Sequence, residues 1–211
     1  MYTLYYAPGS AAIAPHAALE EIGAPHTLVR VDTKAGEHRR PDYLKLNPHG
    51  RIPTLVDGEF VMYESAAILM HLADKHPEAR LATPTGTPQR GRYYQWVCYL
   101  TNTVQEAFMQ YYHQDYFADS AAAQAEVKAV AERRLAGMWE KLDAALAQGP
   151  YLLGAEFSAP DIFLTMLARW SRGCAKPAYT HANIGRCCDL VRRRPAFERM
   201  MRAQEIAWPV A

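Results

Sequence analysis

The spacing of hydrophobic residues changes near residue 77. Before this point, short apolar runs typical of strands alternate with stretches whose apolar residues recur at helical spacing. The predicted order is strand, helix, strand, helix, strand, strand and helix, which is the pattern of a small α/β unit. The strands are predicted at residues 3–7, 26–32, 52–56 and 59–63, and the helices at residues 12–23, 41–48 and 65–76.

Turn residues mark the ends of several of these elements. Pro15 is tolerated only in the first turn of the first helix, and Gly23 suits the C-terminal stop of that helix. Asp57-Gly58 lies between two apolar runs, so it predicts a hairpin with a two-residue turn.

The chain after residue 77 predicts no strand. Pro84, Gly86 and Pro88 lie close together, which indicates a linker. Helical spacing then returns at residues 89–117, 121–148 and 158–172, and residues 184–207 predict one or two more helices. We therefore predict an α/β domain at residues 1–77, a linker at residues 78–88 and an all-helical domain at residues 89–211.

Charge and cysteine content exclude several classes of function. The 23 basic and 22 acidic residues give a net charge of +1, so bulk charge does not favour nucleic-acid binding. Residues 192–194 are three arginines, which we interpret as the solvated end of a helix. The four cysteines lack the spacing of a zinc site, and we expect free, mostly buried thiols in a reducing cytosol. We expect neither a signal peptide nor a membrane span.

The dipeptide Ile52-Pro53 is the first local signal of a binding site. A proline at the start of a strand removes one donor from the sheet, which suits an edge. An X-Pro bond can also be cis, and the backbone of Ile52 would then be able to pair with an extended peptide. A simple edge-strand proline is the alternative.

The segment Tyr63-Glu64-Ser65 is the second signal, because it joins a strand to a helix. We expect Ser65 to be the N-cap, and the free N–H groups beside it suit a carboxylate. Glu64 could bind an ammonium group, so the pair could hold the zwitterionic end of an amino acid. The alternative is an ordinary cap with an exposed glutamate. Ser158 and Asp161 have the spacing of a capping box and are expected to be structural.

The ordered combination of these signals resembles one protein family. The segments YYAPGS, NPHGRIPTLV, YESAAILMHLAD and FSAPDIFLTMLARW, in this order, are similar to those of cytosolic glutathione transferases, and most similar to bacterial beta-class members. The resemblance implies a thioredoxin-like N-terminal domain followed by an all-helical C-terminal domain. It also implies a cytoplasmic homodimer that acts in detoxification.

The resemblance implies one ligand for the two signals. Pro53 would be cis, and Ile52 would pair with the cysteinyl backbone of glutathione. Glu64 and Ser65 would hold the γ-glutamyl end of that tripeptide. Arg51, Lys34, His38 and Gln105 are further candidates for contacts with glutathione.

The nucleophile of such an enzyme is the thiol of glutathione, so the protein has to stabilise the thiolate. Ser10 and Tyr6 are the candidate catalytic hydroxyls, although Ser10 could instead bond its own turn and Tyr6 could be core. Beta-class members typically carry a cysteine in this turn, and the matching position is Ala11. No mixed disulfide with glutathione can form there. Ala12 also departs from the family pattern, which often has a serine.

The first long helix after the linker departs from the family as well. Cys98, Gln105 and Glu106 stand where beta-class members often carry an asparagine, a histidine and a lysine. Glu106 replaces a cation with an anion, which puts conventional glutathione affinity in doubt. We expect Cys98 to be core, with a redox role as the alternative.

Aromatic residues of the helical domain are candidates for the pocket of the second substrate. We expect this pocket between the domains, lined by Phe108, Tyr112, Phe163 and Trp170. The alternative is that an aromatic stripe at helical spacing is core.

These observations predict conjugation of glutathione to small apolar electrophiles. Peroxide reduction, disulfide reduction and isomerisation are alternative glutathione chemistries, and the missing cysteine counts against dithiol exchange. A binding or interaction protein without turnover is the other alternative, because of the departures at Ala11, Gln105 and Glu106. Glutathione is the expected co-substrate, with no metal or nucleotide implied.

Overall fold

The computed structural model describes residues 1–209, and their contacts group them into two units. The first unit contains residues 1–82 and 192–208, and the second contains residues 83–191. The predicted domain boundaries at residues 77 and 89 stay predictions. None of the helices within the described residues has both the length and the apolar character needed to cross a membrane.

The first unit is built on a four-stranded sheet with the strand order β2-β1-β3-β4. β1 runs parallel to β2 and antiparallel to β3, and β3 pairs antiparallel with β4. Alternation along β1 buries Tyr2, Leu4 and Tyr6 on the same face. The strands are β1 (Tyr2–Tyr6), β2 (His26–Arg30), β3 (Thr54–Asp57) and β4 (Phe60–Tyr63).

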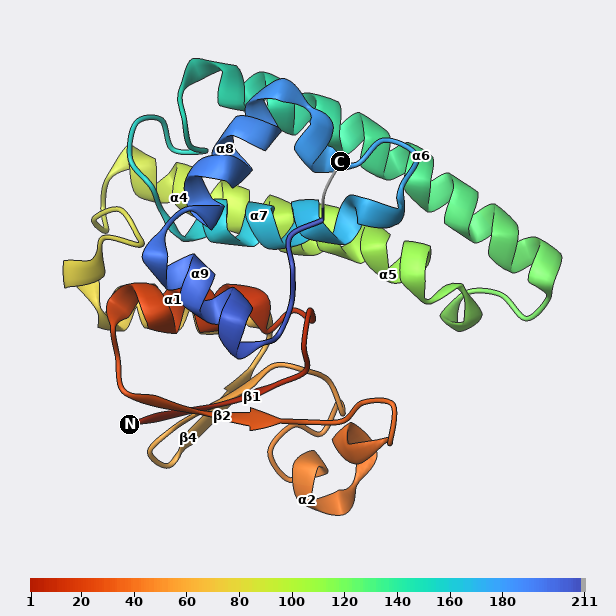
Figure 1. Ribbon diagram of the computed structural model, residues 1–211, viewed down its shortest axis with the longest axis horizontal. Helices are drawn as coiled ribbons and strands as arrows, with labels where there is room; N and C mark the ends of the chain where they lie inside the picture. The colour runs from red at the N-terminus through yellow and green to blue at the C-terminus, as the bar shows by residue number, and fades with distance from the viewer. Residues whose placement is uncertain (210–211) are drawn as a thin grey trace. The chain divides into compact units, whose positions relative to one another are not determined.

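Helices cover the sheet of the first unit. In Figure 1, α1 and α9 lie side by side on one face of the sheet, and α2 lies on the other. α3 also packs against α1. The helices of this unit are α1 (Ile13–Ile22), α2 (Pro41–Leu44), α3 (Ser65–Lys75) and α9 (Pro195–Ala203).

Two turns of this unit contain a glycine whose backbone is left-handed. Gly23 ends α1 with a left-handed φ of 71°, as predicted. In the hairpin, Asp57 pairs with Phe60, so the turn residues are Gly58 and Glu59 and not Asp57-Gly58. The difference is one residue, because the left-handed Gly58 (φ 64°) occupies the first turn position rather than the second.

The segment that returns to the first unit after residue 191 is held against α1 by ion pairs. Arg194 donates to both carboxylate oxygens of Glu21, at 2.6 and 2.8 Å. Arg199 of α9 donates to the Glu20 carboxylate at 2.6 Å and to its backbone carbonyl at 2.9 Å. The run of arginines predicted to be a solvated helix end therefore contributes Arg194 to a contact with α1.

The regular elements of the second unit are helices within its described residues, as the chain after the linker predicts, apart from a single bridge between Tyr151 and Gly154. α7 is its central helix, since every residue from Ala159 to Arg169 is buried. A π-helical segment, Leu100–Gln105, joins the first two helices of the unit. The helices are α4 (Pro88–Tyr99), α5 (Glu106–Tyr112), α6 (Ala121–Ala145), α7 (Ala159–Trp170) and α8 (Ala182–Arg192).

The predicted capping box at the start of α7 is confirmed. Asp161 is fully buried, and its carboxylate accepts hydrogen bonds from the backbone N–H of Ser158 at 2.8 Å and from the Ser158 hydroxyl at 3.0 Å. It also accepts from the backbone N–H of Leu152 at 2.8 Å. Asp161 therefore ties the preceding loop to the central helix of the second unit.

Replacing this carboxylate should destabilise the protein strongly. Asp161→Ala leaves three buried donors without their acceptor, so we expect a loss of about 3 kcal/mol in the free energy of unfolding. Ser158→Ala removes one cap and should cost only about 1 kcal/mol. Urea unfolding followed by circular dichroism measures both. Equal costs for the two variants would contradict the central role of the carboxylate.

An ion pair between the hairpin and α3 should make stability depend on pH. A hydrogen bond from Lys75 holds the pKa of Asp57 below its usual range, and His71 lies 3.4 Å from the same carboxylate. A carboxyl whose pKa is lowered by folding stabilises the protein above its unfolded pKa of ~3.9, and this contribution is lost as the pH falls. Asp57→Asn should therefore cost roughly 0.5–1 kcal/mol at neutral pH.

The cost of Asp57→Asn should be smaller at pH 3 than at pH 7, because the stability that a lowered carboxyl pKa provides is lost as the pH falls toward that pKa. Urea unfolding at both pH values checks this. Asp42→Asn is the matched control, because Asp42 pairs with Lys45 at 2.8 Å but its side chain is 94% exposed. A control variant that loses as much stability as Asp57→Asn would contradict the assignment.

Candidate active site

The turn between β1 and α1 carries Ser10, whose hydroxyl is engaged by the turn itself. Its Oγ donates to the carbonyl of Ala7 at 2.7 Å and accepts from the N–H of Ala12 at 3.2 Å. Ser10 is half-buried, and the adjacent Ala11 is buried. The side chain thus has the hydrogen bonds of a turn serine, and its catalytic role stays a prediction.

Tyr6 lies at the end of β1, directly before this turn. Its side chain is 8% exposed, and its ring centroid is 6.3 Å from that of His16 on α1. The Tyr6 hydroxyl makes no hydrogen bond to any residue that the structure describes. Tyr5 points to the opposite face of the sheet, where its ring lies 5.9 Å from Tyr43. Tyr6 therefore has an uncommitted donor, whereas Ser10 does not.

The peptide bond between Ile52 and Pro53 is cis. Within residues 1–209, no hydrogen bond reaches the backbone N–H or C=O of Ile52. The preceding Arg51 is held in place, because its carbonyl accepts from the Tyr43 hydroxyl at 2.7 Å and from the Asn47 side chain at 2.8 Å. The segment before β3 is thus fixed while its backbone remains available for pairing.

The N-terminus of α3 differs by one residue from the prediction. Glu64, not Ser65, is the N-cap residue, and Ser65 is the first residue of the helix. The sequence favoured Ser65 because serine is a common N-cap, but here the backbone of Glu64 turns the chain with a positive φ of 71°. Glu64 is exposed and its side chain makes no capping hydrogen bond, whereas Ser65 is buried.

The first N–H groups of α3 have no acceptor among the described residues. Those of Ser65, Ala66 and Ala67 precede the first helical hydrogen bond, which Ile68 donates to the carbonyl of Glu64 at 2.9 Å. The Ser65 hydroxyl likewise makes no hydrogen bond within residues 1–209. Together with the helix dipole, these donors can hold a carboxylate.

The loop before α2 carries two of the candidate basic residues. Lys34 is exposed, and only its backbone is held, by Asp32 at 2.9 Å. His38 is half-buried, and its Nδ1 has no partner among the described residues. Gly50 approaches this loop so closely that a Cβ there would lie 2.9 Å from the carbonyl of His38. Arg51, the other candidate cation of the first unit, is also exposed.

The candidate residues of the second unit have partners of their own. The side-chain amide oxygen of Gln105 accepts a hydrogen bond from the Thr101 hydroxyl at 3.3 Å. The Glu106 carboxylate accepts from Arg134 at 3.0 Å and from Gln110 at 2.7 Å, so an ion pair balances its charge. Cys98 was expected in the core, but it is exposed, because the buried side of α4 carries Tyr93 and Val97.

The four predicted pocket residues fall into two groups. Phe108 and Phe163 are at most 1% exposed, which is typical of core residues. Tyr112 is 41% exposed, and its hydroxyl donates to the carbonyl of the half-buried Trp170. Phe108 lies between the rings of these two residues, with its centroid 5.9 Å from that of Tyr112 and 5.8 Å from that of Trp170. Their role as a pocket stays a prediction.

Gln204 contributes to the candidate site, and sequence analysis did not find it. Its side-chain oxygen accepts from the N–H of Gly9 at 3.2 Å, and its nitrogen lies 3.1 Å from Nδ1 of His16. Burial lowers the pKa of His16 to about 4, and the neighbouring His26 acts in the same direction. Because Gln204 lies 188 residues after His16, no local pattern could have connected them.

The comparisons with family models and with known proteins agree on one family. Residues 1–74 match the glutathione S-transferase N-terminal domain, and residues 118–202 match the glutathione S-transferase C-terminal domain. Glutathione S-transferase 2 of Anopheles gambiae is 30% identical over 187 residues, which are 87% of each chain.

Solved structures agree over almost the whole chain. A glutathione transferase homologue from Sulfitobacter with bound glutathione has a TM-score of 0.90 and 26% identity, over 98% of this chain and 99% of that one. The beta-class glutathione S-transferase of Sphingomonas chungbukensis has a TM-score of 0.85 and 29% identity, over 97% of this chain and 100% of that one. The chain belongs to the glutathione S-transferase family.

Proposed function

We propose that this protein binds glutathione on its first unit and transfers the glutathione thiolate to small apolar electrophiles. The proposal rests on two sets of backbone hydrogen-bonding groups that lie in the same unit and have no partner among the described residues. The backbone of Ile52 has no hydrogen-bond partner among the described residues, and neither do the first three N–H groups of α3. An extended peptide with a free α-carboxylate matches both features.

Each end of glutathione has candidate partners. The α-carboxylate of the γ-glutamyl group would accept from the first N–H groups of α3 and from the Ser65 hydroxyl. The exposed Glu64 carboxylate would hold the neighbouring ammonium group. Ile52 would pair with the cysteinyl backbone, next to the cis Pro53. Lys34 and Arg51 are candidates for the glycine carboxylate, since both are exposed cations of the same unit.

Thiolate stabilisation would come mainly from Tyr6. A free thiol has a pKa of ~8.5, and lowering it by one unit requires about 1.4 kcal/mol of preferential interaction with the thiolate. A hydroxyl that donates to sulfur can supply this amount. The Ser10 hydroxyl would first have to give up its bond to the Ala7 carbonyl, which is 2.7 Å long. The Tyr6 hydroxyl has no such bond to break among the described residues.

The departures from the beta-class pattern favour conjugation over thiol exchange. Ala11 supplies no thiol at the turn, so exchange of a disulfide with glutathione has no protein partner there. Glu106 is less unfavourable for an anionic ligand than its charge implies, because Arg134 pairs with it.

We propose that the enzyme is a cytoplasmic homodimer, as is typical of the family, and that Tyr112 and Trp170 contact the electrophile.

A non-catalytic glutathione-binding protein is the second candidate, and the engaged hydroxyl of Ser10 favours it. Calorimetry with glutathione, followed by a conjugation assay with chlorodinitrobenzene, separates the two. Heat of binding together with turnover supports the enzyme. Binding without turnover on a panel of electrophiles supports the second candidate, and no binding contradicts both.

Substitutions at the N-terminus of α3 should weaken glutathione binding. Ser65→Ala removes a hydrogen bond to a charged group, which is worth about 1.5–3 kcal/mol, or roughly a tenfold to hundredfold loss of affinity. Glu64→Gln should cause a similar loss by removing the partner of the ammonium group. Calorimetry measures both dissociation constants. Glu59→Gln in the hairpin turn is the matched control, and an equal loss there would contradict the assignment.

Tyr6→Phe should impair catalysis more than Ser10→Ala. Without the Tyr6 hydroxyl, the pKa of bound glutathione should rise by about one unit, which lowers kcat/KM near pH 6.5 by roughly tenfold and moves the pH profile upward. The pH dependence of conjugation measures this shift. Tyr5→Phe is the matched control, because Tyr5 points to the opposite face of the sheet. Unchanged profiles in both Tyr6→Phe and Ser10→Ala would show that neither hydroxyl stabilises the thiolate.

A further inference from the structure

Three potential metal ligands meet where α1 packs against the start of β2. His16 and Glu20 are one helical turn apart on α1, so their side chains share a face of the helix. His26 is the first residue of β2. The ligating atoms of the three side chains all lie within 4.8 Å of one another. We call these residues the His16–Glu20–His26 cluster.

The nitrogen of His16 that faces the cluster lacks a hydrogen bond. His16 is fully buried, and its Nε2 has no hydrogen-bond partner within the described part of the chain. Oxygen Oε1 of Glu20 lies 3.7 Å from this nitrogen, which is too long for a hydrogen bond. A buried polar atom without a partner is costly, so its presence requires an explanation. Coordination of a cation by Nε2, after this nitrogen has lost its proton, supplies one.

The other two ligands are oriented toward the same point by outer contacts. Nδ1 of His26 lies 2.8 Å from the carbonyl of Ala24, so this nitrogen carries the proton and Nε2 presents its lone pair. Nε2 of His26 is 3.6 Å from Oε1 of Glu20. The second oxygen of Glu20 is held by Arg199 at 2.6 Å, which leaves Oε1 directed at the two histidines.

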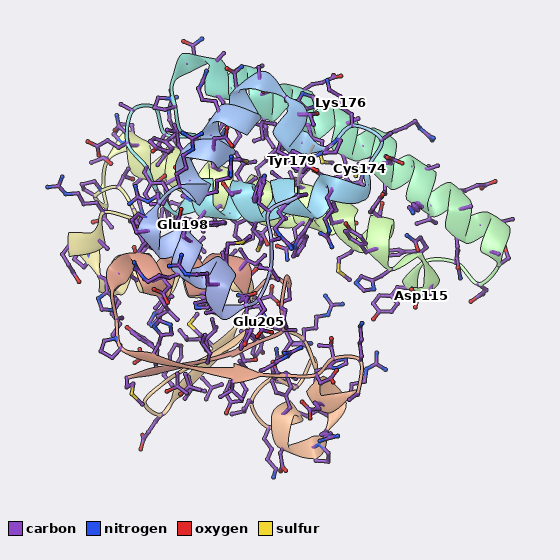
Figure 2. The ribbon with its side chains drawn as sticks, viewed as in Figure 1. Asp115, Cys174, Lys176, Tyr179, Glu198 and Glu205 are labelled. Atoms are coloured by element: carbon purple, nitrogen blue, oxygen red, sulfur yellow. The ribbon has the colours of Figure 1, made fainter. Side chains whose placement is uncertain are left out.

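Other carboxylates of the returning segment are engaged elsewhere. Glu198 on α9 lies 3.8 Å from Arg202, and Glu205 after α9 lies 3.9 Å from Arg30. Figure 2 labels these two glutamates. Glu20 is the carboxylate whose oxygen lies near the facing nitrogens of both histidines. Its side chain is 16% exposed and that of His26 is 13% exposed, so a hydrated cation can reach the site from solvent.

We propose that the His16–Glu20–His26 cluster binds one divalent transition-metal ion such as Zn²⁺. Two imidazoles and one carboxylate are a ligand set that Zn²⁺ takes in proteins, with a water molecule in the fourth position. Bonds of about 2.0–2.1 Å in a tetrahedron place neighbouring ligand atoms about 3.3 Å apart. The two separations of 3.6 and 3.7 Å need only a few tenths of an ångström to reach that value, and the third, between the two imidazole nitrogens, is at most 4.8 Å and has to reach the same value. The cluster is outside the proposed glutathione contacts and does not depend on them.

Metal binding would also act on the turn that carries Ser10. The oxygen of Gln204 accepts from Gly9, so its nitrogen donates to Nδ1 of His16, and the proton of the neutral ring is on Nε2. Coordination through Nε2 moves this proton to Nδ1, and the Gln204 amide must then turn to accept it. The hydrogen bond from Gly9 to Gln204 is lost in the metal-bound form. The cluster would thereby couple metal binding to the turn before α1.

The test is metal titration of the full chain without a histidine tag. Calorimetry with Zn²⁺ should give one site, and Co²⁺ should give the visible absorption of a tetrahedral complex without a thiolate band. His26→Gln and Glu20→Gln should each weaken binding at least about tenfold. Both positions are partly exposed, so these variants avoid the folding risk of replacing the buried His16. Circular dichroism verifies that they are folded.

Two control variants separate the cluster from other metal-binding groups. His113→Gln removes an exposed histidine of the second unit, and Cys98→Ser removes the exposed thiol. Both should leave the dissociation constant unchanged. Absence of Zn²⁺ binding by the wild-type chain would overturn the proposal. So would binding that survives His26→Gln and Glu20→Gln, or that disappears in either control.

Discussion

The buried side-chain amide of Gln204 is the constraint on which the candidate active site depends. Its oxygen accepts from Gly9 and its nitrogen contacts His16, so one side chain connects the turn before α1 with the helix itself. Leaving the buried His16 nitrogen without this partner would cost about 1–3 kcal/mol. The position of Ser10, which follows Gly9, therefore depends on a residue near the end of the chain. The ion pairs of Arg194 and Arg199 with α1 keep that residue in place.

Two hydroxyls near the same turn illustrate how local bonding decides chemical availability. Ser10 has the more obvious position for catalysis, but its proton is directed at the carbonyl of Ala7. Tyr6 has an unremarkable place on a strand, yet its hydroxyl is the one without a partner within residues 1–209. Similarly, Glu106 carries an unfavourable charge for an anionic ligand in sequence, but Arg134 pairs with it in the structure. In each case the decisive information is the partner and not the residue type.

Features with local causes were predictable from the sequence. The left-handed Gly23, the capping box of Asp161 and the periodicity of the helices depend on residues a few positions apart. Features that depend on distant residues were not predictable. The contact between His16 and Gln204 joins segments 188 residues apart, and the exposure of Cys98 depends on which face of α4 is covered by the rest of the unit. The cluster with His26 also escaped detection, because its spacing matches no known zinc motif.

The uneven environment of the cysteines has a practical consequence. Burial raises the pKa of Cys174 to about 11 and also raises the pKa of Cys187, so both thiols stay protonated and unreactive near neutral pH. Cys188 is buried, whereas Cys98 lies exposed on α4. Maleimide dyes and spin labels would therefore attach first at Cys98, on a helix of the second unit. The protein thus already has an attachment point for spectroscopic probes, and storage in air without a reductant would begin its oxidation there.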